Sequence, residues 1–328
     1  MINSLSNKRF LKLIVIMTIT GLIAVILGNN YLGQNNLKLV LSPTEYRIVK
    51  DAIAKVKVPI NPQRLVTLHG TALESALALG EKPVGTTLNG DRNRQPDFLK
   101  DKLDLSNVEV LGSFSEPNLE KILLLKPDLI LDLDTANIYS QLRQIAPNIV
   151  TEYDPANSWQ PSLRTYAEAL GKSELAEEII TNYYDRLDKF KTEINKKGKP
   201  ITVSVIRIYP QGFTFYQPDS FSGSILKDAG LSRPPLQIQG GVQTSISQEL
   251  ISEADADIIF YWAYSDDYHS KNDRIKTNLE KLTSDPLWQQ LNAVKQGKVY
   301  QVPDYWIGYS SLAANAVIDD LYKYILDQ

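Results

Sequence analysis

The longest hydrophobic pattern in the chain predicts a helix of about 24 residues, which would be roughly 36 Å long. Its apolar side chains recur every three or four residues from Ser173 onward, so they form one stripe along the helix. The stripe consists of Leu175, Ile179, Tyr183, Leu187, Phe190 and Ile194. Acidic residues near Glu174 and lysines near Lys196 match the helix dipole. Gly198 and Pro200 then end the helix.

Two further stretches, Pro117–Leu131 and Ser247–Phe260, share a pattern in which a short helical segment leads into a continuous apolar run. One constant offset pairs Glu120 with Glu249, Ile122 with Ile251 and Asp128 with Asp257. We expect the helices to begin behind Ser115 and Ser247, whose hydroxyls can accept from free N–H groups. Apolar runs without alternation are typical of strands buried on both faces. The repeat therefore predicts two related α/β lobes.

The remaining pattern fits the same architecture. Alternation over Arg47–Val58 predicts a strand or hairpin. A strand at Leu65–Leu68, a helix at Thr71–Leu79 capped by Gly80, and a strand opening at Lys82 form a parallel-sheet unit. In the second half we expect a strand at 201–208, a hairpin at 213–216, a helix after Ser220 and a strand at 299–302. The predicted fold is α/β, with two mainly parallel sheets flanked by helices and joined by the long helix.

These elements divide the chain into five parts. We expect a signal peptide or membrane anchor at 1–28, a tether at 29–44, an N-terminal lobe at 45–172, an inter-lobe helix at 173–198 and a C-terminal lobe at 199–328.

The first part has the form of an export signal, with Lys8 and Arg9 before an apolar core. No small-x-small cleavage triplet follows that core, and Asn29 stands where a bacterial lipoprotein has cysteine. Lipid attachment at that position is therefore excluded. The apolar stretch from Phe10 is about 18 residues, or roughly 27 Å as a helix, which is marginal for spanning a bilayer. Both outcomes stay open, and we favour an uncleaved anchor within residues 10–28 of a periplasmic protein.

Composition excludes several classes of function. A net charge of -3 and a pI near 5.6 provide no broad basic surface, which disfavours nucleic-acid binding. The chain has no cysteine, so it has neither disulfides nor thiolate ligands. His69 and His269 are its two histidines, too few for an ordinary zinc or manganese receptor site. We expect no metal ligands, no catalytic residues and no bound cofactor.

Aromatic residues and an arginine gather beyond several predicted strand ends. They are Arg207, Tyr209, Trp262, Trp306 and Tyr309. One such aromatic is usually a lid on the core, but recurrence at several strands favours a shared pocket. His69 follows the strand at Leu65, where α/β sheets hold ligands, although a backbone-bonded loop histidine explains it as well. Arg92 and Arg94 belong either to an anion clamp or to a solvated loop.

Several motifs in one order carry a resemblance to a known family. They are PQRLVTL from Pro62, LESALALGEKPVG, GSFSEPNLEKILLLKPDLIL, IYPQGFTFYQPDSFSGSILKDAGLSRP and DPLWQQLNAVKQGKVYQVPDYWIGYSSLAANAVIDDL. From about residue 45 to residue 326 the chain resembles the class III periplasmic binding proteins of ATP-driven importers for ferric siderophores, haem and cobalamin. The match is closest to the iron-siderophore branch. The resemblance implies a monomeric receptor whose long helix is a strut, with a small hinge motion when ligand binds.

The resemblance also assigns roles. A ferric siderophore brings its iron fully coordinated, so its receptor needs aromatic walls and fixed positive charge. Arg207 would make the charge contact, with Trp262, Trp306 and Tyr309 as walls and Tyr209 as a donor. Arg92 or Arg94 would close the site from the other lobe, where His69 is a further contact.

In this family, glutamates at matching positions of the two lobes dock onto arginines of the two permease subunits. The resemblance gives that role to Glu120 and Glu249. The alternative is that both residues only complement helix dipoles.

Other functions remain open. The cargo is haem or cobalamin if His69 and the tyrosines act as axial ligands. A siderophore esterase is the contrasting class, but the GYSSL sequence around Ser310 lacks the second glycine of a nucleophile elbow. A third alternative is an adhesion or sensor module. Hydroxamate, citrate-type and catecholate siderophores all suit arginine and aromatics, so the chelator chemistry is left open.

Overall fold

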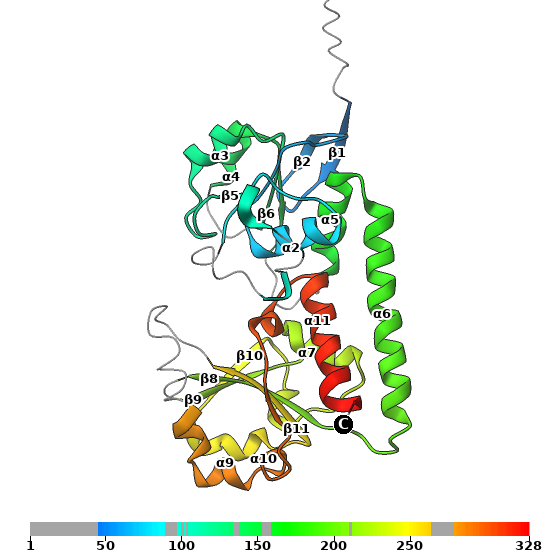
Figure 1. Cartoon of the computed structure of the whole chain (residues 1–328), viewed down its shortest axis with the longest axis vertical. Coiled ribbons are helices and arrows are strands. Elements are labelled where there is room, and N and C mark those ends of the chain that lie inside the picture. Colours follow the sequence, from blue (N-terminus) through cyan, green and yellow to red (C-terminus); the bar gives the residue numbers. More distant parts are fainter. Residues whose placement is uncertain are drawn as a thin grey trace, which may run out of the picture. The chain divides into compact units, whose positions relative to one another are not determined.

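The computed structural model describes residues 45–88, 97–99, 102, 104–133, 138–152, 159–209, 212–263 and 279–327. This part of the chain contains two five-stranded sheets and a two-stranded hairpin, with helices packed around the sheets (Figure 1). The predicted two-lobe α/β fold is thus confirmed. The expected export signal or anchor and the tether lie outside the described residues. From residue 45 onward, none of the described helices is both long and apolar enough to cross a membrane.

The first sheet is built from parallel strands in the order β5-β4-β3-β6-β7. The strands are β3 (Leu65–Thr67), β4 (Gly85–Thr86), β5 (Glu109–Val110), β6 (Leu129–Leu133) and β7 (Asn148–Thr151). The connecting helices are α2 (Gly70–Ala78), α3 (Leu119–Leu125) and α4 (Tyr139–Ile145), with short 3-10 turns at Asp97–Leu99 and Leu105–Asn107. Strand β6 is buried along its whole length, as expected for a strand covered on both faces.

The second sheet mixes strand directions in the order β10-β9-β8-β11-β12. Its strands are β8 (Val203–Tyr209), β9 (Gly212–Tyr216), β10 (Gln243–Ile246), β11 (Ile258–Ala263) and β12 (Val299–Gln301). Strands β8, β11 and β12 are parallel, whereas β9 pairs antiparallel with β8, and β10 pairs antiparallel with β9. The helices are α7 (Phe221–Asp228), α9 (Pro286–Gln290), α10 (Asn292–Lys295) and α11 (Ser311–Leu321). The 3-10 segments η4 (Pro235–Gln237), η5 (Gln248–Ala254) and η6 (Asp304–Ile307), and the π-helical turn η7 (Tyr322–Leu326), complete this part.

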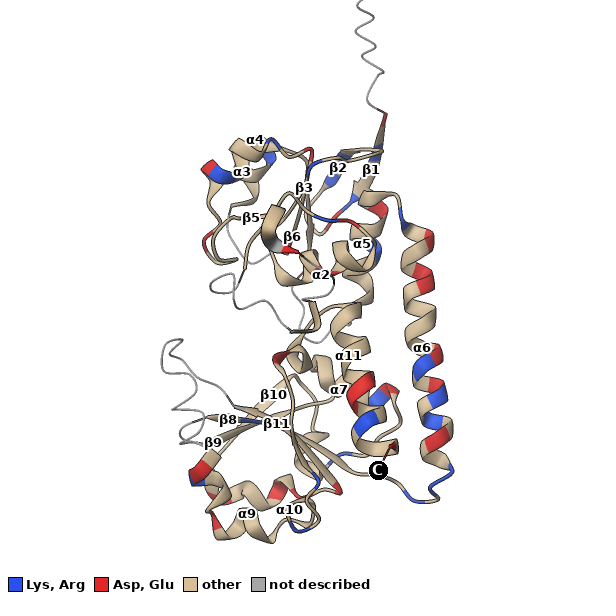
Figure 2. Cartoon of the chain, viewed as in Figure 1, with Lys and Arg blue, Asp and Glu red and all other residues tan. Residues whose placement is uncertain are grey.

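Two helices connect these sheets along the chain. Helix α5 (Gln160–Leu170) ends at Gly171, whose φ of 73° lies in the left-handed region that favours glycine. Helix α6 (Ser173–Asn195) follows at once, with acidic residues along its first half and a mixture of acidic and basic residues along its second half (Figure 2). The predicted stripe is buried from Tyr183 onward, while Leu175 and Ile179 are only partly covered. Lys172 rather than Ser173 is the N-cap, and it makes no side-chain capping bond.

The hairpin predicted from alternation is also present. Strand β1 (Tyr46–Lys50) pairs antiparallel with β2 (Lys55–Pro59), so that Val49 faces Val56. Both valines are fully buried, while the residues between them are mostly exposed. Asp51 closes the turn by accepting from the N–H groups of Ile53 and Ala54, at 2.8 and 2.6 Å.

The internal repeat forms α3 and β6 in one lobe and η5 and β11 in the other. Asn118, not Ser115, is the N-cap of α3, because its amide oxygen accepts from Lys121 N at 2.9 Å. Ser247 does precede η5 but makes no side-chain capping bond there, and η5 is a kinked 3-10 segment rather than an α-helix. The predicted start of α3 behind Ser115 was wrong, whereas η5 does begin behind Ser247 but without the expected capping bond. Both strand predictions are confirmed.

Candidate functional site

Aromatic residues surround Arg207 near the carboxyl ends of β8 and β11. Arg207 and Trp262 are register partners on these adjacent parallel strands. The Arg207 guanidinium carbon lies 5.2 Å from the centre of the Tyr209 ring, and its Nη1 is 3.4 Å from the Tyr216 hydroxyl. The Tyr216 ring in turn lies 4.7 Å from the Trp262 ring. The structure thus brings together three predicted site residues, and it adds Tyr216.

Tyr216 was absent from the predicted site because it sits on an antiparallel strand. Side chains alternate between the faces of a strand, so the register of β8 with β9 puts Tyr216 on the face of Arg207. Trp262 is 5 % exposed, and its indole N–H has no hydrogen-bond acceptor among the described residues. A half-buried cation between aromatic rings and an unpaired donor can hold an oxygen-rich anion with flat surfaces.

Trp306 was expected to form an aromatic wall of the ligand pocket, but the structure places it in the core. Its side chain is fully buried, its ring lies 4.5 Å from that of Phe260, and its Nε1 donates to Asp320 at 2.8 Å. The Tyr305 hydroxyl donates to the same carboxylate oxygen at 2.7 Å. Burial raises the pKa of Asp320 above its usual range. The turn after β12 therefore directs this indole into the core, where it satisfies a buried acid, and in this conformation it presents no surface to solvent.

His69 is the N-cap of α2. Its Nδ1 accepts from Thr71 N at 3.1 Å, and its ring lies 5.0 Å from that of Phe114. Burial lowers the pKa of His69 to about 4, so the imidazole is neutral at pH 7. The capping bond leaves Nε2 as the nitrogen able to meet a ligand. Ligand contact by His69 stays a prediction.

The two other predicted contacts, Arg92 and Arg94, lie outside the described residues. Among the residues that are described, no group of three or more His, Asp or Glu is placed to hold a metal ion.

A cavity opens beside the first sheet and reaches the second lobe at Tyr309. Its empty volume is about 820 Å³, including space open to solvent. The floor lies at the carboxyl ends of β6 and β7, and one side is the β1–β2 turn. The lining consists of Lys50, Asp51, Ala52, Thr71, Leu133, Val150, Thr151, Glu152, Trp159, Pro161, Ser162, Thr165 and Tyr309. The Tyr309 ring also packs against Phe221 at 5.8 Å.

Of the predicted site residues, only Tyr309 lines this cavity in the described structure. Sequence analysis missed the rest of the wall, although two signals point to it. Leu133 and Thr151 end parallel strands, and ligands bind at the carboxyl ends of such strands. Trp159 stands at the start of α5, one residue before the helix. Apolar surface together with several hydroxyls suits a bulky polar ligand.

Glu120 and Glu249 occupy matching places on the surface. Each is exposed in the first turn of the helical segment before a central strand. Hydrogen bonds from its own backbone N–H and from the Ser247 side chain lower the pKa of Glu249, so its carboxylate is charged at neutral pH.

The chain is similar to known proteins over most of its length. The model of a family described as periplasmic binding protein matches residues 65–306. The probable siderophore-binding lipoprotein YfiY of Bacillus subtilis is 35% identical over 298 residues, covering 87% of this chain and 90% of the relative.

Two solved structures share the fold. Staphylococcus aureus SirA complexed with staphyloferrin B has a TM-score of 0.74 and 28% identity, covering 85% of this chain and 98% of that one. FeuA of Bacillus subtilis, a triscatecholate siderophore binding protein solved with ferri-bacillibactin, has a TM-score of 0.70 and 26% identity, covering 86% and 99%.

Proposed function

Because this chain belongs to the periplasmic binding protein family, as a class III member of the iron-siderophore branch, we propose that it captures a ferric siderophore and delivers it to the permease of an ATP-driven importer. The family consists of substrate-binding proteins, so the chain is not an enzyme. Its relatives are periplasmic proteins or lipoproteins, which supports an extracytoplasmic location. Retention by an N-terminal anchor is part of the proposal.

The observation that carries the proposal is the placement of Arg207 among the rings of Tyr209, Tyr216 and Trp262. A ferric chelate arrives with its iron already coordinated, so it offers its receptor ligand oxygens and flat organic surface. A guanidinium can bond those oxygens in pairs, and the rings cover the organic surface. The protein needs no cofactor or metal ligand for this binding.

Tyr309 would extend the site toward the first lobe, because it lines the cavity there. The arginine pair at 92 and 94 and the ring of His69 are proposed as further contacts from that lobe. Trp306 would act through the packing of the second lobe, since its ring is buried.

Delivery is proposed to use Glu120 and Glu249 as paired contacts for two permease subunits. Their matching exposed positions support this role, because charge pairs at an interface rim set orientation and association rate. Replacing both by glutamine is expected to slow ferric-chelate uptake by cells and to leave chelate affinity unchanged. Unchanged uptake would remove the docking role.

Tryptophan fluorescence tests the binding proposal. Protein covering residues 45–328 is titrated with ferric hydroxamate, citrate-type and catecholate siderophores, haem and cyanocobalamin. We expect one ferric chelate to quench strongly, and Arg207→Ala to weaken its binding at least about tenfold, the size of one or more charge-assisted hydrogen bonds. Arg143→Ala, an exposed arginine of α4, is the matched control.

A haem or cobalamin absorption band, together with no response to ferric siderophores, would mean that the cargo is haem or cobalamin. Silence across the panel from folded protein would overturn the binding proposal.

A further inference from the structure

One side-chain hydrogen bond joins the two lobes directly. Glu74 lies on α2 beside the first sheet, and Ser310 immediately precedes α11 beside the second. The Ser310 hydroxyl donates to the Glu74 Oε2 atom across 236 positions of sequence. The same Oγ accepts from Ala313 N at 3.0 Å, as the N-cap of α11. Ser310 is therefore bonded both to its own helix and to the other lobe.

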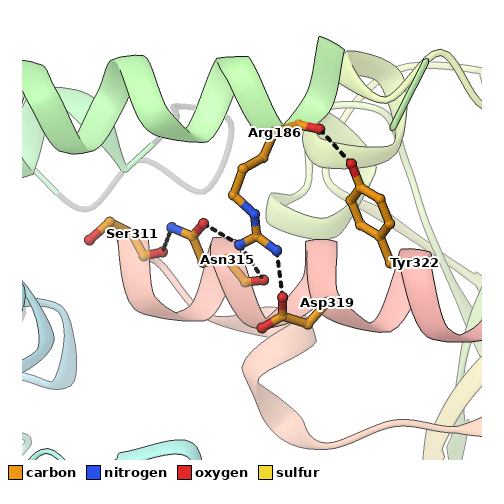
Figure 3. Close-up of polar contacts among 5 residues, drawn as sticks. All are labelled: Arg186, Ser311, Asn315, Asp319 and Tyr322. Carbon is orange, nitrogen blue, oxygen red and sulfur yellow. Dashed lines mark hydrogen bonds and ion pairs between the residues drawn. The ribbon is translucent and has the colours of Figure 1, made fainter. Parts of the chain in front are cut away.

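The opposite part of α11 is held separately by the long helix α6. Figure 3 shows Arg186 reaching across to α11, where it donates to Asn315 Oδ1 and Asp319 Oδ1 at 2.5 Å each. The Tyr322 hydroxyl donates back to the Arg186 carbonyl oxygen at 3.2 Å. Helix α6 thus holds the middle and the C-terminal part of α11. The bond to Glu74 acts at the other end of α11, its N-terminus.

That N-terminus carries part of the cavity wall. Tyr309, directly before Ser310, lines the cavity, and so does Thr71, one turn before Glu74 on α2. Gly308, two residues before Ser310, lies where a side chain has no room, because an added Cβ would be 2.6 Å from the Ala313 Cβ and 2.9 Å from the Tyr305 carbonyl oxygen. The position of Tyr309 relative to Thr71 therefore follows the Glu74 to Ser310 bond.

Glu74 is an unfavourable residue for packing alone. Ala72 and Ala76 on α2, and Ala313 and Ala314 on α11, belong to one buried apolar cluster. Burial and the negative charge of Asp304 on η6 raise the pKa of Glu74 to about 7. A carboxylate that is partly withdrawn from solvent, as Glu74 is, costs folding free energy once ionised. A role in the fold alone would be served as well by an apolar side chain.

Other charged groups on the packed elements are already engaged. His69 caps α2, and on α11 Asp319 pairs with Arg186 while Asp320 accepts from Tyr305 and Trp306. On α5, Arg164 pairs with Glu177. The Ser310 hydroxyl is the one hydrogen-bond donor that the described structure records for the Glu74 carboxylate.

We infer that Glu74 is a positioning residue of the ligand site: by holding Ser310 it fixes Tyr309 of the second lobe against the cavity wall of the first. The identity of the ligand in this inference rests on the proposed function. The contact between Glu74 and Ser310 does not depend on it. Glu74 itself does not line the described cavity.

A ligand-free measurement tests the geometry by itself. The chain has no cysteine, so Leu124→Cys on α3 and Leu287→Cys on α9, both at exposed positions, take spin labels at two defined sites. We expect a narrow distance distribution in the parent and in Glu74→Gln, whose amide oxygen still accepts from Ser310. Glu74→Leu and Ser310→Ala should broaden or shift it, and Ser310→Thr should restore it.

Ser220→Ala is the matched control for the lost cap. Ser220 caps α7 by accepting from Gly223 N at 3.0 Å, but its hydroxyl donates within its own lobe, to Gln217 O at 2.7 Å. Ser220→Ala removes a helix cap of the same kind, but it leaves the hydrogen bond between Ser310 and Glu74 in place. A distribution unchanged in both Glu74→Leu and Ser310→Ala would overturn the inference.

A second measurement separates positioning from stability. At pH 8 we expect Glu74→Leu to bind the ferric chelate about tenfold more weakly while its denaturation midpoint does not fall. Full affinity in Glu74→Leu would also overturn the inference. If the parent binds no ferric chelate, the proposed function fails, and the spin-label distances still decide whether Glu74 positions the second lobe.

Discussion

The repeat unit of the first lobe, α3 with β6, and that of the second, η5 with β11, agree inside the protein and differ on its surface. Ile122 and Ile251 are both fully buried at the same place in the unit. Asp128 N donates to the Arg64 carbonyl, and Asp257 N donates to the Thr202 carbonyl, so each aspartate joins the start of the neighbouring strand. The shared residues are those that assemble a parallel sheet.

The outward positions of the two units diverge. Leu123 and Leu124 of α3 are 59% and 79% exposed, whereas the matching positions in η5 are Ser252 and Glu253. Helix α3 has a side-chain cap, while η5 has none and is kinked at Leu250. Packing against a sheet constrains the inward residues, and solvent leaves the outward ones free to differ. The comparison teaches that the two units build a sheet in the same way. Their exposed residues are not constrained by this packing, so each surface can contact a different partner.

The largest expected loss of stability comes from replacing the two aspartates, which tests this equivalence. Asp128 accepts from the N–H groups of Gln63 and Arg64 at 2.7 and 2.9 Å, whereas Asp257 accepts from Thr202 N at 2.8 Å. At about 1.5 kcal/mol for each bond to a charged acceptor, Asp128→Ala should lose about 3 kcal/mol and Asp257→Ala about half of that. Urea denaturation at pH 7 measures both. Equal losses would mean that the second bond at Asp128 contributes nothing.

Glu74, in the contact between the lobes, should give a change in unfolding free energy of intermediate size. Because the native pKa of Glu74 is raised above its unfolded value, its contribution to stability is complete below about pH 4.5 and is lost as pH rises through about 7. The unfolding free energy of the parent should therefore fall, relative to Glu74→Gln, by on the order of 2 kcal/mol between pH 5 and pH 8.

Denaturation curves at several pH values give this difference, and Glu253→Gln, at an exposed glutamate of the second lobe, is the control. Parallel pH profiles for the parent and Glu74→Gln would contradict a raised pKa for the Glu74 carboxyl in the folded protein.

The smallest expected effect concerns the starts of the two helical segments. Asn118→Ala removes the capping bond of α3 and should cost about 1 kcal/mol. Ser247→Ala should cost less than about half as much, because η5 has no side-chain capping bond to lose. The same denaturation assay compares them. A larger loss at Ser247 would restore the original prediction that serines start both segments.

Much of the fold was predictable because its signals are local. The unalternated runs at 129–131 and 258–260 are buried central strands, and the stripe from Tyr183 to Ile194 is the buried face of α6. The predicted β8 to β9 hairpin is confirmed. Errors arose where two local candidates compete, as for Ser115 and Asn118, since which side chain caps depends on where the chain bends.

The candidate site was only partly predictable. Arg207, Tyr209 and Trp262 could be expected to meet, because adjacent parallel strands bring their carboxyl ends to one edge. Trp306 obeys the same rule in sequence, yet a buried acid 14 residues later takes its indole N–H into the core. No pattern within one element reveals such a partner.

The sequence by itself determined the two-lobe α/β class, the long helix and the iron-siderophore branch, because periodicity, repeats and ordered motifs are written along the chain. Only the tertiary structure decided that Tyr216 joins Arg207, that the cavity forms beside β6 and β7, and that Glu74 meets Ser310. Those contacts join residues from different elements, and the last spans 236 positions. Their energies depend on register, burial and distance, which exist only once the sheets have assembled.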